Sequence, residues 1–197
     1  MAEAKRALRK QALALRRQLH DPAAADAARD NLLRILDRDI ALPPEAAVSG
    51  YIAMRGELDP LPALLALEAR GLRVALPYTA GKGLPLRFLA APGAVATGQD
   101  FFGIAAPPES APACDPDILL VPLAAFDRRG YRLGYGGGFY DAALTRLRAA
   151  KPVVAIGWAY AAQEVAAVPT EPHDARLDWI VTEREALYIT TELSSSD

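Results

Sequence analysis

Residues 130–141 read Gly-Tyr-Arg-Leu-Gly-Tyr-Gly-Gly-Gly-Phe-Tyr-Asp, and this stretch constrains the fold more than any other. Glycine fills four of the five positions from 134 to 138, with Arg132 before them and Asp141 after them. Consecutive glycines can adopt positive φ and turn several N–H groups toward one anion. A guanidinium adds a forked cation, and a carboxylate can bind a metal ion that bridges phosphates. The pattern predicts a phosphate-binding loop, and the alternative is a tight glycine turn without a ligand.

The loop matches neither of the two best-known phosphate-binding motifs. A Walker loop requires Gly-x-x-x-x-Gly-Lys followed by Ser or Thr, and residues 130–141 contain no lysine. The dinucleotide fingerprint requires a third glycine at the position that Phe139 occupies after Gly134 and Gly136. These differences argue against an ordinary P-loop NTPase and against a Rossmann dehydrogenase.

The segments on either side of the loop predict its place in the fold. Upstream, residues 117–122 read Asp-Ile-Leu-Leu-Val-Pro, which is typical of a strand buried on both faces. Downstream, residues 141–148 have the apolar spacing of a helix. Strand, loop and helix in this order put the glycines near the carboxyl end of a parallel strand, where open α/β sheets bind their ligands.

The alternation of strands and helices continues along the chain. We expect helices at about residues 2–19, 22–38, 60–70 and 140–150. We expect strands at about residues 47–53, 72–77, 84–89, 117–122, 152–158 and 177–182, with residues 187–190 as a candidate antiparallel edge strand. The prediction is a single α/β domain spanning residues 1–197, in three layers, with a mostly parallel open sheet and helices on both faces.

The basic residues of the first helix fall into two classes. An apolar stripe is formed by Leu8, Ala12, Leu15 and Leu19. At 100° per residue, three basic residues lie within about 40° of one another beside this stripe: Lys5, Arg9 and Arg16. Three others point further into solvent: Arg6, Lys10 and Arg17. A basic helix face is usually only solvated, so this spacing alone does not predict a ligand.

The composition limits the classes of function. At 197 residues the chain can bury roughly 70% of its unfolded surface as one domain. A net charge of -2 argues against a general nucleic-acid-binding protein, and the lone Cys114 excludes an internal disulfide. The charged first residues and the absence of an apolar run of membrane length predict a cytoplasmic protein that binds neither nucleic acid nor membrane. We expect a monomer.

Several different short motifs follow one another along the chain, and together they resemble a known family. The most specific of them are Val121-Pro122, Ala125-Phe126-Asp127, residues 130–134 and residues 138–141. Weaker ones are residues 5–9, Gly56-Glu57-Leu58-Asp59, Phe102-Gly103-Ile104, Gln163, Val168-Pro169, His173-Asp174 and Val181-Thr182-Glu183. Together they resemble the 5-formyltetrahydrofolate cyclo-ligase family, also called 5,10-methenyltetrahydrofolate synthetases, nearly from end to end. The chain departs from the family pattern at Pro60, Ala106, Leu123 and Phe139.

The resemblance implies an ATP site made from two segments of the chain. The implied ATP-binding residues are Lys5, Arg6, Ala7, Leu8, Arg9, Arg132, Leu133, Gly134, Tyr135, Gly136, Gly137, Gly138, Phe139 and Tyr140. Among them, Lys5, Arg132 and Tyr140 are the candidate catalytic residues. The two cations would neutralise charge during phosphoryl transfer, and Tyr140 would form a hydrogen bond near the reacting formyl group.

The resemblance also implies a folate site and a metal site. The implied folate contacts are Ile52, Glu57, Tyr135, Gly136, Gly137, Gly138 and Phe139. A carboxylate at Glu57 suits the donor-rich pterin, although from the sequence alone it is as readily an exposed loop residue. The implied cofactor is Mg²⁺, with Asp141 and Asp174 as ligands, because magnesium generally uses one or two carboxylates plus substrate phosphates.

The implied activity is the ATP-dependent conversion of 5-formyltetrahydrofolate to 5,10-methenyltetrahydrofolate, with release of ADP and phosphate. Both substrates, ATP and the folate, are small molecules. Two alternatives remain. One is a non-catalytic nucleotide- or folate-binding relative that kept the fold, and the other is an ATP-dependent ligase or kinase that acts on a different small molecule.

Overall fold

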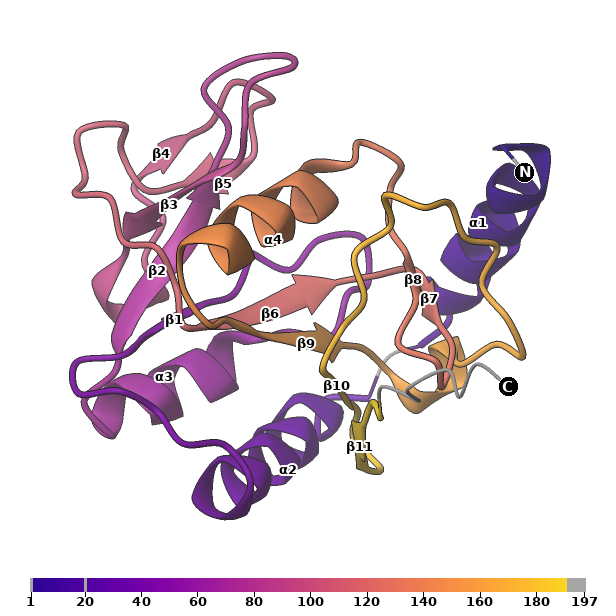
Figure 1. The fold of residues 1–197 in the computed structure, drawn as a ribbon, viewed down its shortest axis with the longest axis horizontal. Helices are drawn as coiled ribbons and strands as arrows, with labels where there is room; N and C mark the ends of the chain where they lie inside the picture. The colour runs from indigo at the N-terminus through magenta and orange to yellow at the C-terminus, as the bar shows by residue number, and fades with distance from the viewer. Residues whose placement is uncertain (1, 20, 191–197) are drawn as a thin grey trace, which may run out of the picture.

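Seven strands form one sheet through the middle of the molecule in the computed structural model, which describes residues 2–19 and 21–190 (Figure 1). They are β1 (Ala47–Ser49), β2 (Arg73–Tyr78), β3 (Arg87–Ala90), β6 (Ile118–Pro122), β9 (Val154–Trp158), β10 (Trp179–Val181) and β11 (Ala186–Tyr188). The order across the sheet is β11-β10-β9-β6-β1-β2-β3. The five central strands run parallel, and β3 and β11 pair antiparallel at the two edges.

This sheet confirms the predicted α/β class. The candidate edge strand at 187–190 is present as β11, and it begins one residue earlier than predicted. The antiparallel direction of β3 was not predicted. Two further pairs of strands were also missed, because each strand is only two residues long: β4 (Gly98–Gln99) with β5 (Ala105–Ala106), and β7 (Ala125–Phe126) with β8 (Arg132–Leu133).

Helices cover both faces of the sheet, as predicted. The helices α2 (Ala24–Arg38) and α3 (Leu61–Ala69) lie on one face, and α4 (Phe139–Ala150) lies on the other (Figure 1). The buried residues of α2 recur at helical spacing: Ala24, Ala28, Leu32 and Ile35. Two short 3₁₀ turns, Pro92–Ala94 and Ala161–Gln163, complete the elements. No helix within the described residues combines the length and the hydropathy that crossing a membrane requires.

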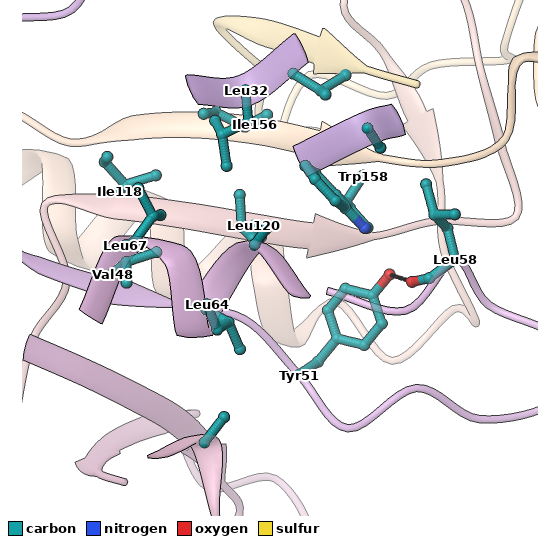
Figure 2. Packing of buried hydrophobic residues seen from close by; sticks show 14 of the residues in the cluster. Leu32, Val48, Tyr51, Leu58, Leu64, Leu67, Ile118, Leu120, Ile156 and Trp158 are labelled. Atoms are coloured by element: carbon teal, nitrogen blue, oxygen red, sulfur yellow. Dashed lines mark hydrogen bonds between the residues drawn. The ribbon is translucent and has the colours of Figure 1, made fainter. Parts of the chain in front are cut away.

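The core explains why the central strands form. Residues 118–121 of β6 are completely buried, which fits a parallel strand covered on both faces. On the face of α2 and α3, Leu120 and Ile156 pack with Leu32, Leu64 and other members of one apolar cluster (Figure 2). At the edge of this cluster, the hydroxyl of Tyr51 donates a 2.8 Å hydrogen bond to the carbonyl of Leu58. This bond closes the loop that follows β1.

The connections between strands reverse direction at the centre of the sheet. From β1 the chain passes through α3 to β2 on one side, and from β6 it passes through α4 to β9 on the other. Because β1 and β6 are parallel neighbours, their carboxyl ends meet at the same edge. Such a topological switch point is where open α/β sheets bind ligands. The loop after β1 carries Glu57, and the segment after β6 carries the glycines.

The first helix, α1 (Ala2–Arg16), does not cover the sheet but lies at this carboxyl edge, beside β7 and β8 (Figure 1). Its apolar contacts there are few, and Ala12 is buried with Leu133 and Val168. The predicted apolar stripe was wrong at one position, since Leu15 is 42% exposed. Arg16 is buried completely in its place. The helix also ends three residues earlier than predicted.

Candidate active site

The glycines form an exposed loop that leads into the amino terminus of α4. Gly136 and Gly138 have φ values of 95° and 67°, which a residue with a side chain adopts only under strain. Gly138 caps α4, so the first N–H groups of this helix and its positive dipole end face the loop. The local geometry is therefore that of an anion-binding turn.

One of the basic residues of α1 lies directly against this loop. The Nε of Arg9 donates a 2.7 Å hydrogen bond to the carbonyl of Gly134. A Cβ atom at Gly136 would lie 3.2 Å from the Nη2 of Arg9, so a side chain there would crowd the guanidinium. Two segments more than a hundred residues apart in sequence thus form one basic surface, as the predicted ATP site requires.

The angular sorting of α1 is confirmed by the exposure of its residues. Lys5 and Arg9 are half-buried and Arg16 is buried, whereas Arg6, Lys10 and Arg17 are exposed. Ala7 is exposed and Leu8 is half-buried.

Lys5 is held by two carboxylates at the rim of the loop. Its Nζ lies 2.8 Å from Glu171 Oε2 and 2.7 Å from Asp174 Oδ2. Burial alone would lower the pKa of Lys5, but the two carboxylates outweigh it and raise that pKa. The same contacts outweigh burial at Asp174 and lower the pKa of its carboxyl group, and Lys5 lowers the pKa of Glu171 as well. The predicted cation and the predicted metal ligand therefore already contact each other.

Arg132 and Asp141 form a second ion pair beside the first. The Nη2 of Arg132 lies 2.8 Å from Asp141 Oδ1, and its Nη1 donates a 2.6 Å hydrogen bond to the carbonyl of Ala175. The backbone N–H of Ala175 donates to the same Asp141 oxygen at 3.0 Å. Burial lowers the pKa of Arg132. Asp141 and Asp174 thus approach each other through Ala175, the residue that follows Asp174.

The oxygen atoms gathered here suit a magnesium ion. Oxygen from Glu171 and Asp174 and a nitrogen from His173 lie within 4.8 Å of one another. Asp141 uses only Oδ1 in its hydrogen bonds with the described residues, which leaves Oδ2 as an oxygen donor. Carboxylate oxygens are the hard donors that magnesium prefers, so these residue types fit the ion, but Asp141 is not part of the close group formed by Glu171, His173 and Asp174. Glu171 was not among the predicted ligands, and only the folded structure shows that it lies beside Asp174 and Lys5.

The loop after β1 carries Glu57, which is buried and not exposed. Its Oε2 accepts a 3.0 Å hydrogen bond from the N–H of Met54, and its Oε1 accepts a 3.0 Å bond from the hydroxyl of Tyr135. The guanidinium of Arg16 lies 3.4 Å from Oε1. Burial raises the pKa of Glu57, while Met54, Arg16 and Tyr135 oppose the rise.

The predicted folate contacts also include apolar and aromatic side chains. Ile52 is half-buried at the edge of the core cluster. The ring of Phe139 meets that of Phe102 edge to face, with 5.9 Å between centroids. The hydroxyl of Tyr140 forms no hydrogen bond with the described residues, and burial raises its pKa well above the usual value. It therefore stays protonated and can donate to a ligand.

Besides Glu171, two residues of the site were not predicted from the sequence. Phe102 belongs to one of the weaker family motifs, and its contact with Phe139 depends on the folding of a distant loop. Arg16 was sorted to the inner stripe of α1 but was given no role. Its burial beside Glu57 was not predictable from the helix alone.

Comparison with known proteins agrees with this geometry. Residues 1–183 match the 5-formyltetrahydrofolate cyclo-ligase family. The 5-formyltetrahydrofolate cyclo-ligase of Mycolicibacterium smegmatis is 33% identical over 149 residues, which cover 71% of this chain and 75% of that protein. The cyclo-ligase of Escherichia coli K12 is 34% identical over 143 residues, covering 68% and 76%.

A solved structure extends the similarity to the fold. The 5,10-methenyltetrahydrofolate synthetase of Aquifex aeolicus superposes with a TM-score of 0.72 at 26% identity, covering 98% of this chain and 96% of the other. The match along the sequence, the identity to both cyclo-ligases and the shared fold lead to one assignment. The chain belongs to the 5-formyltetrahydrofolate cyclo-ligase family, a family of ligases.

Proposed function

We propose that the site at the carboxyl ends of β1 and β6 carries out the reaction of this family, the ATP-dependent cyclisation of 5-formyltetrahydrofolate to 5,10-methenyltetrahydrofolate. The observation that carries the proposal is the 3.0 Å hydrogen bond from the hydroxyl of Tyr135 to Glu57 Oε1. Through this bond, the loop suited to phosphate and the carboxylate suited to a pterin form adjoining walls of one site. A reaction that joins ATP to a folate needs this proximity.

The chemical problem is an unreactive, amide-like formyl oxygen. In the proposed reaction this oxygen attacks the γ-phosphorus of ATP, and the bond from that phosphorus to the bridging oxygen of ADP breaks. N10 then bonds to the formyl carbon, the carbon–oxygen bond breaks, and phosphate leaves with the former formyl oxygen. N10 loses its proton as the ring closes. Phosphoryl transfer of this kind depends mainly on positioning and charge neutralisation.

The cations of the site supply that neutralisation. Arg9 already lies against the loop, and Lys5 lies at its rim between two carboxylates. An incoming triphosphate competes with those carboxylates for the Lys5 ammonium. Arg132 donates hydrogen bonds to the Asp141 carboxylate and to the carbonyl of Ala175. It therefore contributes positive charge to the site and also holds the Asp141 carboxylate in place. The N–H groups at the start of α4 add further donors.

The residues around Glu57 orient the second substrate, 5-formyltetrahydrofolate. Glu57 accepts N–H groups of the pterin, and Ile52, Phe102 and Phe139 supply apolar and aromatic surface against its rings. Phe139 replaces the tyrosine usual in the family at this position, so no hydroxyl is available from that ring. The free hydroxyl of Tyr140 remains as the donor for the formyl group.

We infer that Asp141 and Asp174 hold a magnesium ion, with Glu171 beside them. When bound, the ion supplies positive charge to the phosphates of ATP. The residues that surround it serve to place those carboxylates. Arg132 and the backbone N–H of Ala175 fix Asp141, while Lys5 and the backbone N–H of Glu171 fix Asp174.

The proposal is tested by mixing the purified protein with ATP, Mg²⁺ and 5-formyltetrahydrofolate and following the near-ultraviolet absorbance of the methenyl product. Product should appear only when all three are present, with one ADP formed per ring closed. Folate binding without product would favour a non-catalytic relative. ATP turnover that does not respond to the folate would favour a ligase or kinase with a different substrate.

A further inference from the structure

We propose that Arg16 is a positioning residue for the folate, which holds the carboxylate of Glu57 and the hydroxyl of Tyr135 in the arrangement that receives the pterin. The inference rests on the proposed function, because it concerns the same site. It assigns a task to a buried cation that the phosphate chemistry does not use.

Arg16 lies at the topological switch point and contacts the segments after both central strands. Its Nη1 donates to the carbonyl of Leu123, just after β6, at 3.2 Å, and lies 3.4 Å from Glu57 Oε1, on the loop after β1. Its Nη2 donates to the carbonyl of Arg55 at 3.3 Å and to the hydroxyl of Tyr135. One guanidinium therefore links the Glu57 turn, the end of β6 and the glycine loop.

The burial of this charge calls for a reason beyond packing. Arg16 is completely buried, and its Nε is a buried nitrogen without a partner among the described residues. Burying a guanidinium with an unused donor costs free energy, and an apolar residue of similar size would fill the space without that cost. A role in holding Glu57 and Tyr135 accounts for the charge, since an apolar side chain could not donate to either.

The backbone of α1 also contacts the turn that carries Glu57. Arg55 and Gly56 both have positive φ, of 53° and 77°. A Cβ atom at Gly56 would lie 3.1 Å from the carbonyl oxygen of Arg16, so only glycine lets the turn approach so closely. The main chain and the side chain of Arg16 thus touch the same short turn. A displacement of Arg16 would therefore move Glu57.

The electrostatic setting makes the role measurable. Glu57 is faced by Arg16 from α1, Tyr135 from the glycine loop, Tyr51 from its own loop and Tyr140 from α4. Of these groups, only Arg16 carries a charge, and it favours the ionised carboxylate. Burial raises the pKa of Glu57, and without Arg16 that rise would be larger. Glu57 would then take up a proton at a higher pH and lose the negative charge that strengthens its hydrogen bonds with the pterin.

The experiment uses four variants: Arg16→Met, Glu57→Gln, the double variant with both changes, and Arg17→Met as the control. Arg17 is the next residue of the chain, and its side chain is exposed and forms no hydrogen bond with the described residues. Binding of 5-formyltetrahydrofolate and of ATP is measured separately by calorimetry, and the folate titration is repeated at several pH values from neutral downward. A structural role alone would not select one ligand.

Arg16→Met should weaken folate binding by about ten- to a hundredfold, the loss expected for hydrogen bonds to a charged group, with ATP affinity changed less than about threefold. As the pH is lowered, the loss of folate affinity should begin at a higher pH in this variant than in the wild type. Arg17→Met should match the wild type. Equal losses for both ligands, or an unchanged pH profile, would overturn the inference.

The double variant provides the decisive comparison. If Arg16 acts through Glu57, adding Arg16→Met to Glu57→Gln should cause little further loss of folate binding, whereas additive losses would show an independent role. If Arg16→Met alone fails to fold, this comparison still decides, because the double variant removes both buried charges together. A wild type that binds no folate would overturn the proposed function, whereas a wild type with full activity and Arg16 variants that match it would overturn only the inference.

Discussion

The ammonium of Lys5 lies 2.7 Å from the carboxylate of Asp174, although 169 residues separate them in the chain. Glu171 contacts the same ammonium at 2.8 Å. The first helix is thereby attached by ion pairs to the loop that precedes β10. Because one partner is a predicted phosphate ligand and the other a predicted metal ligand, we expect this contact to affect both stability and ATP binding.

The stability provided by this cluster should depend on pH. The carboxyl pKa values of Asp174 and Glu171 are lowered from their usual 3.8 and 4.5, so their contribution is present above those values and is lost as the pH falls through the folded ones. Lys5→Met should lower the unfolding temperature at pH 7, and the difference from the wild type should shrink below about pH 4. Thermal unfolding, followed from neutral pH down to strongly acidic pH, measures this. Lys10→Met on the exposed face is the control, and a difference that stays constant with pH would contradict the prediction.

Asp141→Asn should keep the fold and lose turnover. The amide oxygen can still accept from Arg132 and from the N–H of Ala175, but the charge that attracts magnesium is gone. We expect turnover to fall by at least about tenfold, or ~1.4 kcal/mol, at low magnesium, with partial recovery as magnesium rises. Asp115→Asn is a matched control, because Asp115 pairs with Arg146 of the same helix outside the site. Wild-type turnover of Asp141→Asn across the magnesium titration would rule out the metal role.

The two basic faces of α1 should differ in their effect on ATP. Arg9→Ala removes the guanidinium that contacts Gly134 and Gly136, and we expect ATP binding to weaken by roughly 1.5 to 3 kcal/mol. Lys10→Ala alters an exposed residue on the other face and should have little effect. Calorimetric titration with ATP compares them. Equal losses would mean that the side of α1 facing the loop has no special role.

Glu57→Gln should weaken the binding of 5-formyltetrahydrofolate and leave the binding of ATP nearly unchanged. The change keeps the size of the side chain and removes its charge, so the pterin loses a charged acceptor. In the wild type, folate affinity should fall as the pH drops toward the Glu57 pKa, which burial raises above 4.5, and this dependence should vanish in the variant. A binding isotherm for each ligand, repeated at several pH values, checks both points. A loss confined to ATP would move Glu57 out of the folate site.

Much of the fold could be predicted because its central strands are continuous apolar runs. Residues 118–121 are buried on both faces, and such runs are visible in the sequence without knowledge of their neighbours. The two-residue strands of the β7–β8 hairpin carry no period that a pattern could reveal. They form because the chain folds back before the glycine loop.

The candidate site was predictable where the backbone itself creates it, and not where distant side chains complete it. A run of glycines predicts backbone positions with positive φ, and Gly136 and Gly138 have positive φ. Arg16 and Leu15 show the opposite case. A pattern of polar and apolar residues assigns leucine to the core and arginine to solvent, yet the buried position here faces a carboxylate. Only the arrival of Glu57 from a loop after β1 reverses that preference.

The partners of α1 also determine when the site can form. Lys5, Arg9 and Arg16 contact residues that follow them by 169, 125 and 107 positions. The helix is synthesised first, but the groups that hold it leave the ribosome much later. The sheet around β1 and β2 can begin to pack before then, since its contacts are closer in sequence. Ligand binding should therefore be acquired at the last stage of folding, when the start of the chain docks onto a nearly finished sheet.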